Sequence, residues 1–423
     1  MNPQPPKINI AIIGGGIAGL SLAAGLLKQP HIKCHVYEAV TEYADVGAGL
    51  ALHNNGIQAM ECLGPEVKRA YFDKATTVAE EEDVVISTKV ILAHGPHAGL
   101  QVAELGKAKG RKSVSRADLL EGLRALVPDD CISFGKRLMH MVDLGIGGVR
   151  LLFKDRTVRV VDCVLGADGI HSVTRGYILG ENHPATRPKN HDGWKIYRTM
   201  VTTEEARKLI DPKFTETVPI LLGPRGHINC IPLNKNTRLS AGVAVRGGAS
   251  ASANTDSSGL DPAMFAEYTE EAQEIVRMVA RDTSASWEAA DHDDAPCYSR
   301  GHVAMLGDAA HAALPFAGNG ASQALEDAAT INALFAYVRS PSDVVPALKA
   351  YCISRRPRSQ EAVKLARKFG RIYAYAEDGM HEDPERMQMF FKLAAASTNE
   401  FKVEVQNMLA IERFINFKKS GNL

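Results

Sequence analysis

No charge of one sign predominates in this sequence. Its 423 residues include 49 lysines and arginines and 49 aspartates and glutamates, so the formal net charge at pH 7 is +0. A protein that attracts nucleic acid or an anionic membrane over a distance needs a basic excess, which is missing here. The balance of charge therefore argues against nucleic acid and membrane surfaces as partners.

The sequence also lacks a long apolar run, a secretory signal and paired cysteines. No stretch approaches the roughly 18 uncharged apolar residues of a membrane-spanning helix. Residues 1–7 are polar and rich in proline, without the apolar core of a signal peptide. The seven cysteines are scattered and form no CxxC pair, and no histidine has the spacing of a metal-ligand set. We therefore expect a cytoplasmic protein with free thiols and no metal.

A strand, a glycine-rich turn and a helix open the chain. The short β-branched run Ile8–Ile13 leads directly into a Gly-x-Gly-x-x-Gly pattern formed by Gly14, Gly16 and Gly19. Apolar residues then recur at spacings of three and four, as one face of a helix requires. A second apolar strand ends in Glu38. Such a unit places two parallel strands side by side, with the turn at their carboxyl ends.

This turn is suited to the pyrophosphate of a dinucleotide. Glycines let phosphates approach the backbone, and the following helix offers free N–H groups and the positive end of its dipole. The carboxylate of Glu38 can accept the hydroxyls of an adenosine ribose, which favours FAD or NAD over a 2′-phosphorylated cofactor. The alternative is an ordinary glycine turn of a parallel-sheet protein beside a solvated glutamate.

A second stretch, late in the chain, predicts a flavin-binding turn. Asp308 follows an apolar strand at residues 302–306, and Gly318 and Gly320 precede a helix from about Ala321. Small residues let a flat ring lie against the backbone, and the N–H groups of Gly320 and Ala321 would stabilise the negative charge of a reduced flavin. Asp308 can accept hydroxyls of the ribityl chain. The alternative is a plain strand-to-helix turn with a capping aspartate.

Between these motifs the pattern changes to that of an antiparallel sheet. An apolar strand at residues 158–165 ends in Gly-Ala-Asp-Gly. Four short apolar runs follow, broken by glycine, proline and asparagine, at residues 196–201, 218–222, 227–233 and 238–246. This spacing predicts an inserted antiparallel sheet. A mobile loop at residues 247–259 and helices from Ala321 onward complete the prediction.

Three motifs together resemble the fingerprints of one family. They are the opening glycines with Glu38, residues 166–169 with Ser172 and Arg175, and residues 307–328. In order and separation they are similar to class A flavin-dependent aromatic monooxygenases, the family of para-hydroxybenzoate and salicylate hydroxylases. The likeness covers nearly the whole chain, includes residues 45–51 and 115–119, and is closest to fungal polyketide phenol hydroxylases.

The resemblance implies an α/β fold in three parts. A Rossmann-like FAD-binding domain would comprise residues 1–180 and 291–370. An inserted antiparallel β-sheet substrate domain would occupy residues 181–290, and a helical C-terminal extension residues 371–423.

The resemblance also implies bound FAD. NAD(P)H would act as a transient co-substrate, because no second glycine fingerprint follows a strand and opens a helix. Ala51 would contact FAD through its backbone, Arg116 would lie beside its phosphates, and Asp168 would link the phosphates with nicotinamide binding. The implied FAD-binding residues are Gly14, Gly16, Gly19, Glu38, Ala51, Arg116, Asp168, Asp308, Gly320 and Ala321.

For the substrate, the resemblance assigns Arg198 to the binding of an ionised phenol. A guanidinium beside a desolvated phenol favours the phenolate, the more electron-rich form. The alternative is a surface arginine on a strand. These relatives commonly carry a tyrosine before proline where this chain has Ile231, and the candidates to replace its hydroxyl are His53, Tyr197, His227 and Asn229.

The implied activity is an FAD-dependent monooxygenase that uses NAD(P)H and O₂ to hydroxylate a phenolic or polyketide-derived ring through a flavin C4a-hydroperoxide. One alternative is an FAD-dependent epoxidase or oxidase that acts on a non-phenolic substrate. Others are a non-catalytic dinucleotide-fold binding protein and an NAD dehydrogenase. The oligomeric state is left open, with a homodimer as one possibility.

Overall fold

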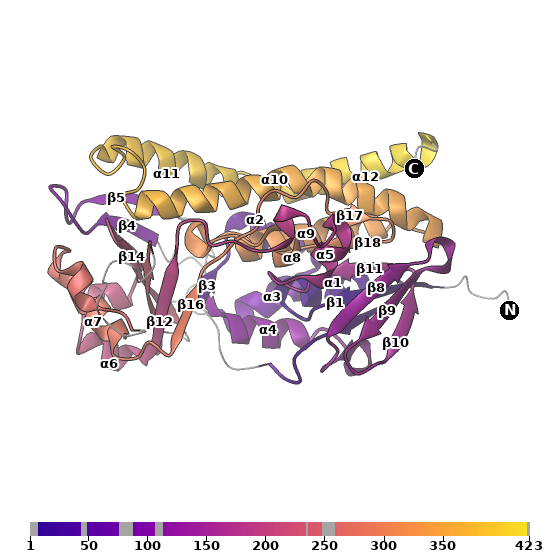
Figure 1. Ribbon diagram of the computed structural model, residues 1–423, viewed down its shortest axis with the longest axis horizontal. Helices are drawn as coiled ribbons and strands as arrows, with labels where there is room; N and C mark the ends of the chain where they lie inside the picture. Colours follow the sequence, from indigo (N-terminus) through magenta and orange to yellow (C-terminus); the bar gives the residue numbers. More distant parts are fainter. Residues whose placement is uncertain are drawn as a thin grey trace.

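Two sheets stand side by side under a layer of C-terminal helices (Figure 1). The computed structural model describes residues 7–43, 49–75, 88–105, 113–233, 236–247 and 259–420. The segment 45–48 and most of the loop predicted at 247–259 lie outside these residues. No helix in the described parts of the chain is long and apolar enough to cross a membrane.

The first sheet has six strands in the order β17-β18-β11-β1-β2-β7. Its inner strands run parallel, as the opening strand–turn–helix unit predicts. The bounds are β1 (Ile8–Ile13), β2 (Ile32–Tyr37), β7 (Ile132–Ser133), β11 (Cys163–Gly166), β17 (Ser299–Arg300) and β18 (Val303–Met305).

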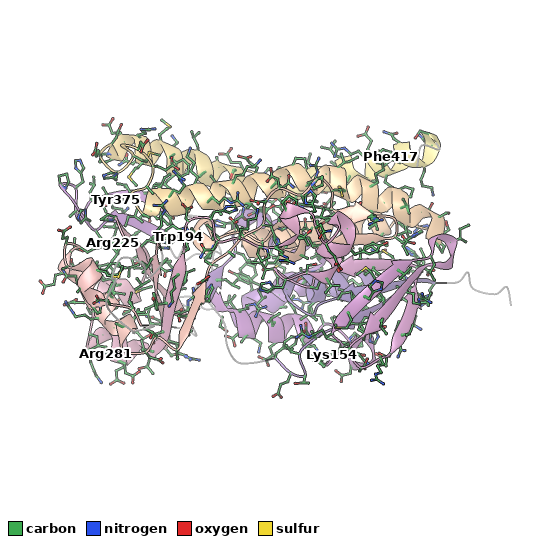
Figure 2. The ribbon with its side chains drawn as sticks, in the orientation of Figure 1. Lys154, Trp194, Arg225, Arg281, Tyr375 and Phe417 are labelled. Atoms are coloured by element: carbon green, nitrogen blue, oxygen red, sulfur yellow. The ribbon has the colours of Figure 1, made fainter. Side chains whose placement is uncertain are left out.

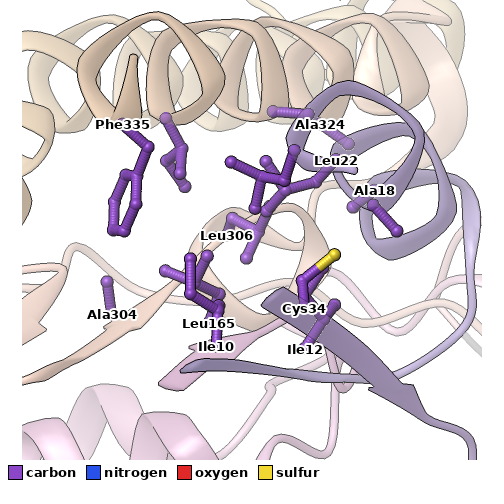
Figure 3. Packing of buried hydrophobic residues seen from close by; sticks show 14 of the residues in the cluster. Ile10, Ile12, Ala18, Leu22, Cys34, Leu165, Ala304, Leu306, Ala324 and Phe335 are labelled. Atoms are coloured by element: carbon purple, nitrogen blue, oxygen red, sulfur yellow. The ribbon is translucent and has the colours of Figure 1, made fainter. Parts of the chain in front are cut away.

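Helices α1 (Ile17–Leu26) and α9 (Gly320–Phe335) pack against each other over this sheet. Figure 3 shows Ala18 and Leu22 of α1 beside Ala324 of α9, with Phe335 at the other end of α9 pointing toward the strands. Helix α1 is apolar almost all round, and nine of its ten residues are buried. This burial fixes the helix N-termini that follow the two glycine turns at the same edge of the sheet.

The second sheet has seven strands in the order β16-β12-β15-β14-β13-β4-β5. The four predicted strands are confirmed as β12 (Lys195–Thr202), β13 (Val218–Gly223), β14 (Gly226–Leu233) and β15 (Arg238–Val245). Strands β4 (Thr88–Leu92), β5 (Gln101–Leu105) and β16 (Ala285–Glu288) extend it, and β4 runs parallel to β13. Strands β4 and β5 precede residue 181, so the second sheet contains strands from both sides of the domain boundary predicted at residues 180 and 181. The predicted domain boundaries stay a prediction.

One prediction about a strand is wrong. Residues 158–165 form two strands, β10 (Val158–Val161) and β11, which belong to different sheets. Asp162 separates them: its backbone N–H donates to the carbonyl of Asn9, and its carboxylate accepts the N–H of Asn9 at 2.7 Å. Strand β10 instead joins β8 (Leu138–Asp143) and β9 (Val149–Phe153), which form a hairpin with a turn at Gly145–Gly147.

The helical C-terminal part is confirmed as three helices that run across both sheets (Figure 1). They are α10 (Val344–Tyr373), α11 (Pro384–Asn399) and α12 (Val403–Ser420). Trp194, which is fully buried, lies where the second sheet meets α10 (Figure 2). The remaining elements are β3 (Gly49–Ala51), α2 (Asn54–Leu63), α3 (Pro65–Lys74), β6 (Ser113–Ser115), α4 (Arg116–Arg124), α5 (Val173–Leu179), α6 (Thr203–Arg207), α7 (Glu270–Ala280) and α8 (Asp308–His311).

Candidate functional site

A cavity of about 510 Å³ lies between the two sheets and the C-terminal helices. One wall is made by the glycine turns of the first sheet and another by the inner face of the second sheet. Of the predicted FAD-binding residues, six line it: Gly16, Ala51, Arg116, Asp308, Gly320 and Ala321. Four predicted FAD-binding residues do not line the cavity: Gly14, Gly19, Glu38 and Asp168. Any contribution they make to the site is therefore other than forming the cavity wall.

The three opening glycines have different tasks. Gly14 has φ +103°, a left-handed value that favours glycine, and a side chain there would collide with the carbonyl of Ala167. A side chain at Gly19 would collide with the carbonyl of Gly14. At Gly16, however, an added Cβ would meet no atom within 4 Å. Gly14 and Gly19 therefore permit close packing, and Gly16 faces open space before the N-terminus of α1.

Glu38 fixes the same turn. Its Oε2 accepts the N–H of Gly15 at 2.6 Å, and its Oε1 accepts the N–H of Val40 at 2.9 Å. The hydroxyl of Tyr43 donates to the carbonyl of Gly15 at 2.6 Å, and burial raises the pKa of this phenol. A carboxylate has about four acceptor positions, so Glu38 keeps capacity for ribose hydroxyls. Sequence patterns offered no signal for Tyr43.

Asp308 and residues 318–321, around the start of α9, line the cavity, and we call them the flavin seat. Gly318 adopts a left-handed conformation with φ +60°, and Asn319, the N-cap of α9, makes no capping bond with its side chain. An added Cβ at Gly320 would meet nothing within 4 Å. The free N–H groups of a sixteen-residue helix thus face empty space, which fits the flat ring of a flavin.

Asp168 lies beside the cavity without facing it. Its carboxylate accepts the hydroxyl of Ser172 at 2.5 Å and the backbone N–H of Thr174 at 3.0 Å. Burial raises its pKa, although these hydrogen bonds oppose the shift. Asp168 therefore anchors the start of α5, while its neighbours Ala167 and Gly169 line the cavity.

On the opposite wall, Arg198 lies in a row that crosses four strands. Arg198 pairs with Gly242, Gly242 with Asn229, and Asn229 with Ile220. Because Gly242 has no side chain, the Oδ1 of Asn229 lies over it, only 2.7 Å from where a Cβ would be. Arg198 and Asn229 thus flank a gap in the wall, and both line the cavity.

The guanidinium of Arg198 has no hydrogen bond or ion pair within the described residues. Its carbon Cζ lies over the ring of Trp287, 5.2 Å from the ring centroid. Burial lowers the pKa of Arg198 to about 10, so the side chain stays cationic at neutral pH. A partly buried cation without a counter-ion is costly, and an anionic ligand would remove that cost.

His227 lies among aromatic rings on the same wall. Its ring centroid is 4.9 Å from Phe316 and 5.0 Å from Tyr373. Burial lowers the pKa of His227 to about 3, so the imidazole is neutral, and its Nδ1 has no hydrogen-bond partner in the described structure. Of the four candidates for the missing tyrosine, His53, His227 and Asn229 line the cavity, whereas Tyr197 packs into the core on the other face.

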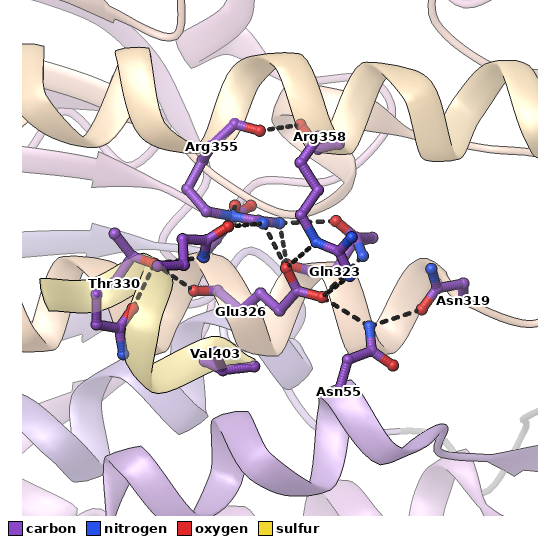
Figure 4. Close-up of polar contacts among 12 residues, drawn as sticks. Asn55, Asn319, Gln323, Glu326, Thr330, Arg355, Arg358 and Val403 are labelled. Carbon is purple, nitrogen blue, oxygen red and sulfur yellow. Dashed lines mark hydrogen bonds and ion pairs between the residues drawn. The ribbon is translucent and has the colours of Figure 1, made fainter. Parts of the chain in front are cut away.

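A buried network of charges lies behind the flavin seat (Figure 4). Asp327 on α9 accepts the N–H of Gly307 at 2.9 Å and pairs with His311 at 2.6 Å and Arg355 at 2.7 Å. Glu326 pairs with Arg355 and with Arg358. Arg355 also reaches Gln406 of α12 at 3.0 Å.

The same network reaches the cavity wall. The amide of Asn55 donates to Glu326 at 2.6 Å and to Asn319 at 3.1 Å. The network therefore connects the flavin seat to helices distant in sequence. Sequence patterns identified Glu326 and Asp327 as part of the late motif but not their partners.

The sequence of this chain is similar to those of known proteins. The model of a family described as "FAD binding domain" matches residues 7–366. The chain is 34% identical to 6-methylsalicylate 1-monooxygenase atA of Aspergillus terreus, covering 90% of this chain and 86% of that protein. It is 31% identical to a salicylate hydroxylase of Pseudomonas putida, with 88% and 87% covered.

Solved structures show the same fold. A salicylate hydroxylase in complex with its substrate superposes with a TM-score of 0.80 at 25% identity, covering 96% of this chain and 98% of that one. HpxO of Klebsiella pneumoniae, solved with FAD and uric acid, gives a TM-score of 0.70 at 23% identity, with 96% and 97% covered.

Proposed function

This chain belongs to the FAD binding domain family and is an FAD-dependent aromatic monooxygenase, and on that premise we propose that it hydroxylates a phenolic acid related to salicylate. Arg198 carries the proposal. It is a cation in the cavity wall with no counter-ion among the described residues. A phenolate or carboxylate would supply that counter-ion through charge-assisted hydrogen bonds.

We assign the two ends of FAD to two helix N-termini. Gly16 and the start of α1 would receive the pyrophosphate, with Arg116 beside it, and Glu38 would accept ribose hydroxyls. The ring would lie on the flavin seat. When bound, FAD takes reducing equivalents from NAD(P)H and activates O₂ for transfer to an aromatic ring.

The chain's own part in the reaction is to hold the ring and its charge. Arg198 would keep the phenol ionised, because a nearby cation lowers the pKa of a phenol in a water-poor site. His227, neutral at every ordinary pH, would offer a hydrogen bond without competing for the negative charge. The aromatic side chains of Phe316 and Tyr373 would keep water from the reacting ring.

The test is turnover of salicylate and its methyl derivatives with NADH or NADPH under ¹⁸O₂, with products identified by mass spectrometry. We expect one ¹⁸O atom in the hydroxylated product. Replacing Arg198 with glutamine should lower kcat/KM by about 10²- to 10³-fold, the cost of removing one partner of a buried charge pair. FAD content should not change.

The matched control is Arg238→Gln, an exposed arginine on the neighbouring strand β15. It should leave kcat/KM within twofold of the wild-type value. A phenolic product without ¹⁸O, or equal losses in the Arg198 and Arg238 variants, would contradict the proposed function.

A further inference from the structure

The cavity continues past the flavin seat into a space between α10 and α11. Ala362, Leu365 and Phe369 of α10 and Ala394, Ala395 and Thr398 of α11 line this part, which we call the helix recess. Resting on the proposed function, we propose that the helix recess binds a hydrocarbon substituent of the phenolic substrate, so that the preferred substrate is an alkylated phenolic acid rather than salicylate itself.

The recess is built by one face of each helix. Ala362, Leu365 and Phe369 recur at spacings of three and four on α10, and Ala394 and Thr398 are four residues apart on α11. These residues therefore point the same way, into the cavity that Arg198 also lines. Three of the six are alanines, and their small side chains leave the space between the helices open.

The recess adjoins the place where the aromatic ring would bind. A side chain at Gly370 of α10 would lie 2.5 Å from the ring of Phe316, so α10 packs directly against the residue that precedes the flavin seat. Tyr373, one turn further along, contacts His227 of the second sheet at 5.0 Å between ring centroids. Because the recess residues and Arg198 line one continuous cavity, a substituent on a ring bound at Arg198 could extend toward the recess.

The chemistry of the recess is apolar. None of its six residues carries a charge, and the hydroxyl of Thr398 is already used, since it donates to the carbonyl of Ala395 at 3.0 Å. The lysines of the same helices, Lys349, Lys364, Lys368 and Lys392, are all exposed. Asn399, at the end of α11, lines the same cavity, and its buried Oδ1 has no hydrogen-bond partner in the described structure, so a polar group could gain a partner there. Along the six residues of the recess, a polar group would lose water without gaining a charged partner, whereas a hydrocarbon would gain from burial.

The two ends of the cavity thus require an amphipathic ligand. Arg198 and Asn229 form a polar end without partners of their own, and the helix recess forms an apolar end. An alkyl chain on a phenolic acid joins these two chemistries in one molecule. Salicylate alone would leave the recess filled with poorly bonded water.

The experiment measures dissociation constants from the change in flavin absorbance of the FAD-loaded enzyme. The ligands are salicylate and salicylates with methyl, propyl and pentyl chains at each free ring position. At one ring position we expect affinity to rise about threefold to fourfold per methylene up to propyl, the gain for transfer of a methylene from water. The kcat/KM for hydroxylation should follow the same order.

Two variants fill the recess from opposite helices, Ala394→Phe and Ala362→Leu. Each should remove the gain from the alkyl chain and leave the affinity for salicylate within twofold of the wild-type value. Leu393→Phe is the control, because Leu393 lies on the outer face of α11 with 65% of its surface exposed. It should change neither ligand.

Affinity that stays flat with chain length at every ring position would overturn the proposal. So would equal losses for salicylate and its propyl derivative in both recess variants, since these would indicate a general structural role. The proposed function fails differently: no ¹⁸O would enter any product. Normal hydroxylation of salicylate with a flat chain-length profile would contradict the recess alone.

Discussion

The two walls of the cavity handle charge in opposite ways. Behind the flavin seat, Glu326, Asp327 and Arg355 are fully buried, and each is bonded to several partners within the chain. On the second sheet, Arg198 and Asn229 face the cavity without a hydrogen-bond partner among the described residues. Bonded charges hold the shape of the wall that we propose binds the cofactor, and unbonded polar groups line the wall that we propose binds the substrate.

The largest expected effect comes from breaking the buried network. Arg355→Met would leave two carboxylates buried without their principal counter-ion. We expect the free energy of unfolding of the FAD-free protein to fall by about 3–5 kcal/mol, as measured by urea denaturation.

The control lies on the other wall. Arg198→Met removes a cation that has no counter-ion, so stability should stay the same or rise slightly. The difference between the walls would be refuted if both arginine variants lost similar stability.

Smaller effects are expected when two glycines of one turn, Gly16 and Gly14, are each replaced with valine. Gly16→Val should weaken FAD binding by roughly 10- to 100-fold, because the side chain would occupy the open space before α1. Gly16 has an ordinary extended conformation, φ −76°, so the thermal midpoint of the FAD-free protein should not change.

Gly14→Val, in contrast, should destabilise the FAD-free protein. The φ of +103° at Gly14 disfavours a side chain, and the carbonyl of Ala167 occupies the position of a Cβ. The thermal midpoint of this variant should fall by several degrees. Calorimetry of the FAD-free protein and titration with FAD measure the two quantities, and equal thermal losses in both variants would rule out the assigned tasks.

A last comparison concerns two neutral histidines: His227 in the cavity wall of the second sheet, and His292, which does not line the cavity and donates its backbone N–H to the carbonyl of Ala312. Burial lowers the pKa values of His227 and His292 to about 3. Below pH 6.5 the unfolded chain binds a proton at each imidazole that the folded chain does not. The free energy of unfolding should therefore decrease as the pH is lowered from about 6.5 to 3. The decrease should be up to roughly 1.4 kcal/mol per pH unit for each histidine.

Urea unfolding of the FAD-free protein at pH 7, 6 and 5 measures this slope. The double variant His227→Gln, His292→Gln should show a shallower decline than the wild-type protein. An unchanged slope would mean that neither histidine stays neutral in the folded state.

Local patterns predicted the strand and helices around the two glycine turns well. The strand Ile8–Ile13, the helix after the glycines and the helix of the late motif formed where apolar spacing placed them, because each depends on neighbours in sequence. The prediction of one strand at residues 158–165 was wrong because the break in it depends on a contact distant in sequence. Asp162 is a single polar residue in an apolar run, and its bonds to Asn9 come from a distant strand.

The cavity wall on the second sheet was predicted only in part. Arg198 was found through resemblance, and Asn229 and His227 were two of four open candidates. What singled them out from Tyr197 is the strand register, because alternate residues face opposite sides of a sheet. The residues of the helix recess gave no signal, since alanines and apolar residues at helical spacing are equally typical of an ordinary core.

The amino-acid sequence by itself determined the class of this protein: its glycine turns, parallel strands and late motif specify an FAD-binding fold through contacts close along the chain. Tertiary structure alone decided which charges are bonded and which face the cavity, and how α10 and α11 enclose the recess. The physical reason is that burial and pairing depend on groups brought together from distant segments, and no local pattern records which of those groups will meet.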